Sequence, residues 1–197
     1  MVPAAATMAV VSLDIRSHLR AALDADPVPE PAPGDRLAAV LALLIEEEDA
    51  VVLTERSAEL RRHAGEISFP GGLAEPGDAS LAATALREAQ EEIGLDPALP
   101  EIVGALPSVH TFVSGILVTP FVGVVQRSPE LAPRDGEVVR VLTTPIARLL
   151  EIERTVTWER PGGRRWTGWV YDVDGSTIWG ATGWMLHDLL ELLRVRV

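Results

Sequence analysis

The stretch "SLAATALREAQEEIGL" (80–95) combines an apolar helical repeat with a dense group of charges. Its apolar residues recur at intervals of three and four, which predicts an amphipathic helix over 80–93. They are Leu81, Ala82, Ala85, Leu86, Ala89 and Ile93. Asp78 or Ser80 suits the N-cap of this helix, and Gly94 stands where a helix often ends.

Three glutamates of this helix fall within five positions. Glu88 is three residues from Glu91 and four from Glu92, so their carboxylates share one helix face, roughly opposite the apolar stripe. A solvated acidic face is one interpretation, because exposed like-charge pairs cost only about 0.2–0.5 kcal/mol each. The other is a site for Mg²⁺ or Mn²⁺, which prefer oxygen ligands. Arg87 precedes Glu91 by four residues, the weaker orientation for helix support, so helix stability alone explains the arrangement poorly.

The segment before the helix favours the cation site. "FPGG" (69–72) contains Gly71 and Gly72, which permit a close approach of the backbone and offer carbonyl oxygens to a hard cation. Arg56, Arg61 and Arg62 concentrate positive charge further upstream, as recognition of substrate phosphates requires.

The flanking patterns predict an α+β fold. A short helix over 12–24 with Ser12 as its cap precedes a linker over 25–36 that carries four prolines. Residues 37–56 read as a buried hairpin, and 57–78 as a long functional loop. Strands, a short helix, a hairpin around "PGG" and a final amphipathic helix follow, without regular βαβ alternation. We therefore expect an N-terminal extension over 1–35 and one domain over 36–197.

Composition narrows the range of partners. The chain has 197 residues, no cysteine and a formal net charge of −12. Thiolate chemistry is excluded, and nucleic acid or an anionic membrane is an unfavourable partner. The sequence shows no signal peptide and no apolar run long enough to span a bilayer, so we expect a cytoplasmic protein.

The helix and its upstream glycines resemble the Nudix box, G-x5-E-x7-R-E-U-x-E-E-x-G-U. The second half matches at Arg87, Glu88, Glu91, Glu92, Gly94 and Leu95. The first half departs, because Ala79 stands where the box has Glu and Leu73 where it has Gly. Asp78 is the nearest acid, and the loop is longer by one or two residues.

Residues 52–72 also resemble the additional motif of coenzyme A pyrophosphatases within this superfamily, L-L-T-x-R-[SA]-x3-R-x3-G-x3-F-P-G-G. Val52 replaces its first Leu. The matching positions are Leu53, Thr54, Arg56, Ser57, Arg61, Gly65, Phe69, Pro70, Gly71 and Gly72. The resemblance implies a Nudix-type α/β/α sandwich with a mixed sheet.

The resemblance also implies metal-dependent hydrolysis of coenzyme A to 3′,5′-ADP and 4′-phosphopantetheine. Glu88 and Glu92 would be metal ligands, and Glu91 a further ligand or the holder of a bound water. A carbonyl of Gly71 or Gly72 would complete the site, and Arg87 would orient a glutamate. Arg56, Arg61 and Arg62 would bind phosphates.

Three questions stay open at this stage. The general base is a glutamate of the box or an acid elsewhere, with Glu66 and Glu137 as outside candidates. The substrate is coenzyme A, another nucleotide such as ADP-ribose, NADH or a dinucleoside polyphosphate, or a nucleotide that is held without cleavage. The aromatic hairpin "TWERPGGRRWTGW" (157–169) suggests a homodimer contact.

Overall fold

The computed structural model describes residues 14–59, 65–111, 115–134, 136–159, 163 and 165–194. Within these residues, eight strands form a mixed central sheet. Five of them lie in the order β3, β2, β1, β7 and β5. The other three pair with members of this row: β4 with β1, β6 with β7 and β8 with β2. The strands are β1 (Arg36–Ile45), β2 (Ala50–Arg56), β3 (Ile67–Ser68), β4 (Gly71–Leu73), β5 (Glu101–Ala105), β6 (Val109–His110), β7 (Ile116–Val125) and β8 (Val138–Pro145). The expected hairpin over 37–56 is confirmed as β1–β2, whose register pairs Leu43 with Val52.

Strand β1 explains why the sheet has a helical layer on each side. Its residues 38–45 are all buried, and successive side chains of a strand point to opposite faces. Even-numbered residues such as Ala42 and Leu44 belong to one hydrophobic cluster, and odd-numbered residues such as Leu41 and Leu43 belong to the other. β7 lies parallel to β1 along its whole length and extends both clusters. The sheet is therefore buried on both faces.

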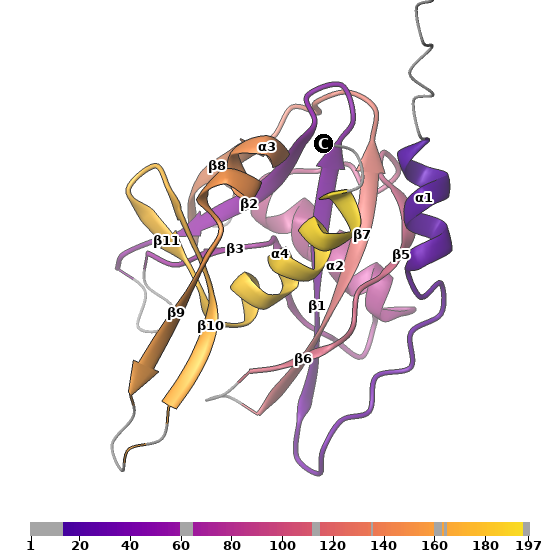
Figure 1. The fold of residues 1–197 in the computed structure, drawn as a ribbon. Coiled ribbons are helices and arrows are strands. Elements are labelled where there is room, and N and C mark those ends of the chain that lie inside the picture. The colour runs from indigo at the N-terminus through magenta and orange to yellow at the C-terminus, as the bar shows by residue number, and fades with distance from the viewer. Residues whose placement is uncertain are drawn as a thin grey trace, which may run out of the picture.

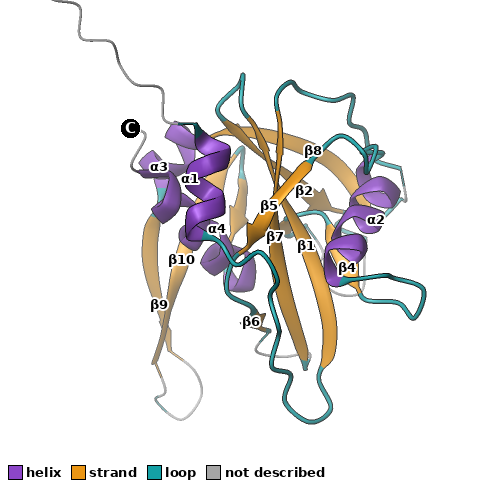
Figure 2. Cartoon of the chain, turned by 90° about the vertical axis from the view of Figure 1, so that its right-hand side faces the viewer, coloured by secondary structure: helices purple, strands orange, loops and turns teal. Residues whose placement is uncertain are grey.

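In the described part of the chain, four helices occupy these faces: α1 (Ile15–Ala22), α2 (Leu81–Ile93), α3 (Ile146–Ile152) and α4 (Gly180–Leu193). Helix α2 covers one face, and α1, α3 and α4 lie on the other (Figures 1 and 2). This arrangement confirms the expected α+β sandwich with a mixed sheet. No helix of the described ranges is long and apolar enough to cross a membrane. The expected cytoplasmic location stays a prediction.

The N-terminal helix shares a core with the rest of the molecule. Asp14 caps α1 by accepting a hydrogen bond from the backbone N–H of Arg16 at 3.2 Å, whereas the expected cap Ser12 lies outside the described residues. Ile15 and Leu19 are buried in the same cluster as α4. Residues 25–35, which follow, contain no helix or strand. Their extended conformation and a domain boundary at residue 35 stay predictions.

A second sheet lies beside the first. It comprises β9 (Arg154–Glu159), β10 (Arg165–Val173) and β11 (Ser176–Ile178), and its β9–β10 hairpin projects from the body of the molecule (Figure 1). Trp158 and Trp166 face each other across the hairpin, with ring centroids 4.4 Å apart. The expected packing of this hairpin on a second subunit stays a prediction.

Candidate active site

Helix α2 has the termini that its sequence predicts. Ser80 is the N-cap, and its hydroxyl accepts a hydrogen bond from the N–H of Ala83 at 3.1 Å. Gly94 ends the helix with φ +71°, a conformation that glycine adopts without steric cost. These caps set where the helix begins and ends, while the burial of Ala85, Ala89 and Ile93 against the sheet fixes its rotation and so the direction in which each glutamate points.

The three glutamates differ in burial. Glu91 is exposed and Glu88 is partly buried, but Glu92 is only 5% exposed. The expectation that all three lie opposite the apolar stripe was therefore wrong for Glu92. Its position is seven residues after buried Ala85 and three after buried Ala89, so Glu92 shares their side of the helix. Ala82, expected in the stripe, is only partly buried.

Glu92 is held by the strand that contains the two glycines. The N–H of Gly71 donates to Glu92 Oε2 at 3.1 Å. Gly71 has φ +155°, and a Cβ on this residue would lie 2.5 Å from the Cα of Val40 on β1. Only glycine permits this approach of β4 to β1, which places the Gly71 N–H beside the helix.

Glu88 lies directly on the backbone of Gly72. A Cβ at this position would be 2.5 Å from Glu88 Cδ and within 2.7 Å of both carboxylate oxygens. Burial raises the pKa of Glu88, while its hydrogen bond from Arg87 opposes that rise. The Gly-Gly pair thus brings the chain against two carboxylates of α2. A role for the glycine carbonyls as metal ligands stays a prediction.

Arg87 connects the glutamates to the loop before the helix. Its Nη1 donates to Glu88 Oε1 at 2.9 Å and to Glu91 Oε2 at 3.1 Å. Its Nε and Nη2 donate to the two carboxylate oxygens of Asp78 at 3.0 and 3.1 Å, and Nη2 also donates to the carbonyl of Leu73 at 3.1 Å. The hydrogen bond from Arg87 holds the pKa of Asp78 well below its usual range. Asp78 precedes Ala79, which stands where the Nudix box has Glu. Its carboxylate holds Arg87 in place through both oxygens.

Arg56 extends from the end of β2 to the same place. Its Nη1 lies 3.6 Å from Glu92 Oε1, and its Nη2 donates to Glu137 Oε2 at 2.6 Å. Nε of Arg56 is buried and has no hydrogen-bond partner among the described residues. Of the other expected phosphate ligands, Arg61 and Arg62 lie outside the described residues. Of the two outside base candidates, Glu137 contacts Arg56 through its side chain, and Glu66 accepts the N–H of Arg56 through its backbone carbonyl at 3.0 Å.

The sequence analysis missed the segment that closes the end of α2. The N–H of Ala132 donates to the carbonyl of Ile93 at 3.1 Å, and that of Arg134 donates to the carbonyl of Glu92 at 2.9 Å. The guanidinium of Arg134 lies against Gly94. Glu137, which contacts Arg56, lies a few residues further along the same segment. No periodicity in this segment indicates that it meets a helix about forty residues earlier in the chain.

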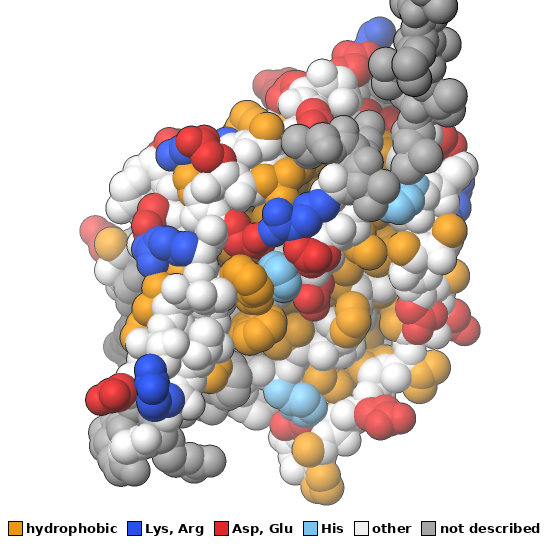
Figure 3. Space-filling model, in the orientation of Figure 1, with side chains coloured by type: hydrophobic (Ala, Val, Ile, Leu, Met, Phe, Trp, Pro, Cys, Tyr) orange, Lys and Arg blue, Asp and Glu red, His pale blue; other side chains and the backbone are white. Residues whose placement is uncertain are grey.

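The α4 face contains another group with metal-binding side chains, Glu153, His187 and Glu191. Arg194 pairs with both carboxylates, and the hydroxyl of Tyr171 donates to Glu153 at 2.7 Å. A guanidinium therefore already neutralises this group, which we interpret as structural. Figure 3 shows acidic and basic side chains interspersed on this face.

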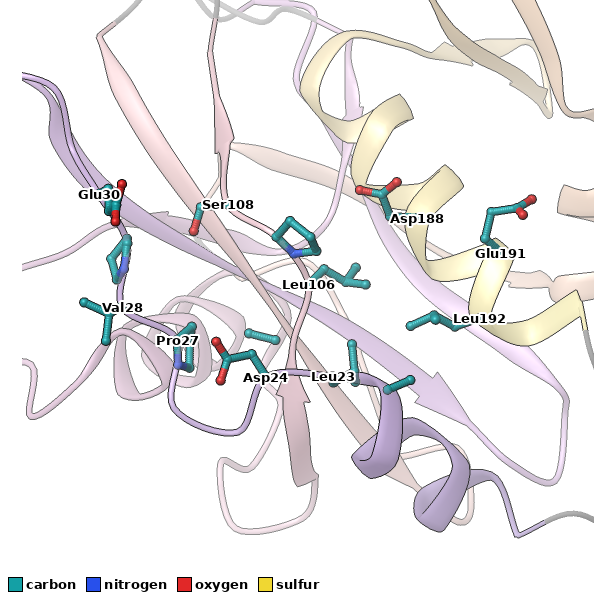
Figure 4. A pocket seen from close by; sticks show the side chains of 14 residues that line it. Leu23, Asp24, Pro27, Val28, Glu30, Leu106, Ser108, Asp188, Glu191 and Leu192 are labelled. Carbon is teal, nitrogen blue, oxygen red and sulfur yellow. The ribbon is translucent and has the colours of Figure 1, made fainter.

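A cavity of about 630 Å³ lies between α1, the linker and α4, on the side of the sheet opposite α2 (Figure 4). Its charged lining residues are acidic: Asp24, Glu30, Asp188 and Glu191. No Lys or Arg is among the described residues that line it. Burial raises the pKa of Asp188. These acidic side chains would repel a phosphate group, so the cavity is a poorer site for an anionic ligand than the arginine-containing group at α2.

We call the group formed by Glu88, Glu91 and Glu92 on α2 the glutamate cage. Comparisons with known proteins show the family of the chain that carries it. The NUDIX domain matches residues 35–166. An uncharacterized Nudix hydrolase NudL from Citrobacter koseri is 36% identical over 166 residues, covering 82% of this chain and 84% of the relative. The Cronobacter sakazakii NudL is 38% identical over 159 residues, covering 78% and 81%.

The fold is also found in solved structures. The NUDIX domain of Shewanella oneidensis NrtR, complexed with ADP ribose, superposes with a TM-score of 0.53 at 19% identity, covering 87% of this chain and 92% of that one. A MutT/nudix family protein from Enterococcus faecalis also gives 0.53, at 16% identity and coverages of 86% and 64%. The chain belongs to the Nudix family, and its class of enzyme is a Nudix hydrolase.

Proposed function

We propose that this hydrolase cleaves the pyrophosphate bond of coenzyme A or one of its derivatives. Water would add across the P–O–P linkage, giving 3′,5′-ADP and 4′-phosphopantetheine. One observation carries the proposal: Arg56, from the 52–72 motif, lies 3.6 Å from Glu92 of the Nudix helix. This contact supports a single site that combines the segment resembling coenzyme A pyrophosphatases with the glutamate cage.

The residues of this site fit a divalent cation. Glu88 and Glu92 are one helical turn apart, and carboxylate oxygens are the ligands that Mg²⁺ and Mn²⁺ prefer. Such a cation, when bound, would neutralise the pyrophosphate and activate water. We assign Glu88 and Glu92 as its protein ligands, with Glu91 as a further ligand and Gly71 or Gly72 as carbonyl donors.

The remaining roles follow from the contacts. Arg87 orients Glu88 and Glu91 through Nη1, while Asp78 holds the other side of its guanidinium. Arg56 has an unpartnered Nε among the described residues and suits a phosphate oxygen of the substrate. We propose the same role for Arg61 and Arg62. Glu137, a general-base candidate outside the helix, contacts Arg56 through its side chain and so lies beside the site.

The test is incubation of the purified protein with coenzyme A and Mg²⁺ or Mn²⁺, with products identified by mass. Glu92→Gln and Glu88→Gln should each abolish release of 3′,5′-ADP, while Glu48→Gln, an exposed change of equal charge on the β1–β2 turn, should not. Thermal unfolding of each variant separates loss of chemistry from loss of fold.

Two other results would assign a different function. Cleavage of ADP-ribose, NADH or a dinucleoside polyphosphate but not of coenzyme A would retain the cage and reject the substrate. Tight binding of these nucleotides without cleavage would indicate a non-catalytic binding domain.

A further inference from the structure

Arg56 occupies an unusual position between two carboxylates of very different exposure. The side chain of Glu92 is 7% exposed, and that of Glu137 is 54% exposed. Arg56 hydrogen-bonds to Glu137 at 2.6 Å, but its contact with Glu92 at 3.6 Å is too long for a hydrogen bond. The guanidinium therefore neutralises Glu92 by charge alone and is anchored at Glu137.

The two oxygens of Glu92 have different surroundings. Oε2 accepts the Gly71 N–H, whereas Oε1 is the oxygen nearest to Arg56. A buried carboxylate needs a counter-charge, because desolvation without one costs several kcal/mol. A divalent cation at the cage would meet that need, and its charge would repel the guanidinium. Arg56 and the cation thus compete for Glu92.

We infer that Arg56 is an internal counter-ion, which leaves Glu92 when a divalent cation binds, stays anchored at Glu137 and offers its buried Nε to an anionic phosphate oxygen of the substrate. This inference rests on the proposed metal-dependent function. It gives Glu137 a positioning role through Arg56 and couples nucleotide binding to metal binding. Nε, which is buried and has no hydrogen-bond partner among the described residues, then has an acceptor in the loaded site.

Removal of Arg56 should therefore tighten metal binding. We expect Arg56→Gln to bind Mn²⁺ about tenfold more tightly than wild type in the absence of nucleotide, because a repelling charge is gone. Glu137→Gln should weaken Mn²⁺ binding, since Arg56 loses its other carboxylate. In the Arg56→Gln background, the Glu137 substitution should have little further effect if Glu137 acts through Arg56.

The conservative variant tests the role of Nε. Arg56→Lys keeps the charge and lacks the Nε donor. It should restore Mn²⁺ affinity to near the wild-type value and still bind α,β-methylene-ADP, a non-cleavable nucleoside diphosphate, about tenfold more weakly than wild type in saturating Mn²⁺. A purely structural role of Arg56 would not separate these two affinities.

The experiment is isothermal titration of the wild type and these variants with Mn²⁺, then with α,β-methylene-ADP. Arg140→Gln is the matched control: Arg140 pairs with Glu55, the neighbour of Arg56 on β2, and should leave both affinities unchanged. Equal or weaker Mn²⁺ binding by Arg56→Gln than by wild type would overturn this inference but not the proposed function. Absence of wild-type Mn²⁺ binding that depends on Glu88 would overturn the proposed function, and this inference with it.

Discussion

At the scale of single residues, Gly72 shows how closely the backbone approaches the cage. Glu88 occupies the space that a side chain at position 72 would need. Gly72→Ala should displace Glu88 and lower kcat for pyrophosphate hydrolysis by about 100-fold, the effect of a misplacement of about 1 Å at a reacting centre. Steady-state kinetics on the cleaved nucleotide measure this loss.

Gly77→Ala provides the control, because a Cβ there meets no atom within 4 Å and the residue lies in the loop that follows β4. Its activity should match the wild type. Equal activities of the two alanine variants would show that the contact between Gly72 and Glu88 does not position the carboxylate for catalysis.

Asp78 offers a second test at this scale. It binds both Nε and Nη2 of Arg87, so Asp78→Asn should loosen the guanidinium that orients Glu88 and Glu91. We expect kcat to fall about 10- to 100-fold, as for other residues that support metal ligands, with a small change in thermal stability. Glu75→Gln, on the same loop, should have no such effect. A drop in thermal stability without a drop in the activity of the folded fraction would assign Asp78 to folding alone.

At the scale of elements, the sequence predicts those features that depend on local pattern. The apolar run of β1, the turn after it and the repeat of α2 place the first hairpin and the Nudix helix correctly. The helical repeat also places position 92 on the buried side, because it lies seven residues after Ala85. The burial of Glu92 was nevertheless not predicted, because a charged residue was not expected on that side.

Contacts between distant segments were not predictable in the same way. The parallel pairing of β1 with β7, the contact of Arg56 with Glu137 and the closure of α2 by residues 132–134 join parts of the chain far apart in sequence. Local propensity carries no information about which elements meet. The family resemblance supplied the candidate residues of the site, but only the packing of β4 against β1 and α2 shows why Gly71 and Gly72 are required.

At the same scale, Glu153 connects several elements, and its contacts predict a pH-dependent contribution to stability. It follows α3, accepts hydrogen bonds from Tyr171 of β10 and His187 of α4, and pairs with Arg194. Burial raises the pKa of Glu153, but these partners outweigh burial and bring it below its ordinary value. A lowered folded-state pKa stabilises the protein above the unfolded value of about 4.3, and this contribution is lost as the pH falls through the folded-state pKa.

We therefore expect Glu153→Gln to lower the free energy of unfolding by about 1–3 kcal/mol at pH 7, because Tyr171 and His187 lose the charged acceptor of their hydrogen bonds. The difference from wild type should shrink below pH of about 4. Denaturant titrations at several pH values measure both effects. Glu151→Gln, which removes an exposed pair with Arg148 on the same helix, should cost less than about 1 kcal/mol at every pH. A pH-independent loss at Glu153 would mean that its charge is not the stabilising feature.

At the scale of the whole molecule, the question is whether the N-terminal segment is an appendage or part of the folding unit. We expect the second answer, because α1 is connected to the rest of the molecule by several kinds of contact. Leu19 is fully buried in the cluster that contains α4. Arg16 donates to Glu46 and Glu101, at the ends of two strands, and Asp24 exchanges two backbone hydrogen bonds with Ala105 of β5.

A helix that shares the main core should unfold with it. Leu19→Ala should lower the free energy of global unfolding by about 2–5 kcal/mol, the cost of a large-to-small change in a packed core, in a single transition. Leu99→Ala, at a half-exposed position, should cost much less. The tryptophans all lie between residues 158 and 184, so their fluorescence reports on the C-terminal part of the chain. If α1 unfolds together with the core, circular dichroism and tryptophan fluorescence should report the same shifted midpoint for Leu19→Ala. A loss of helix signal that leaves the fluorescence transition in place would instead separate residues 1–35 from the hydrolase domain as an independent extension.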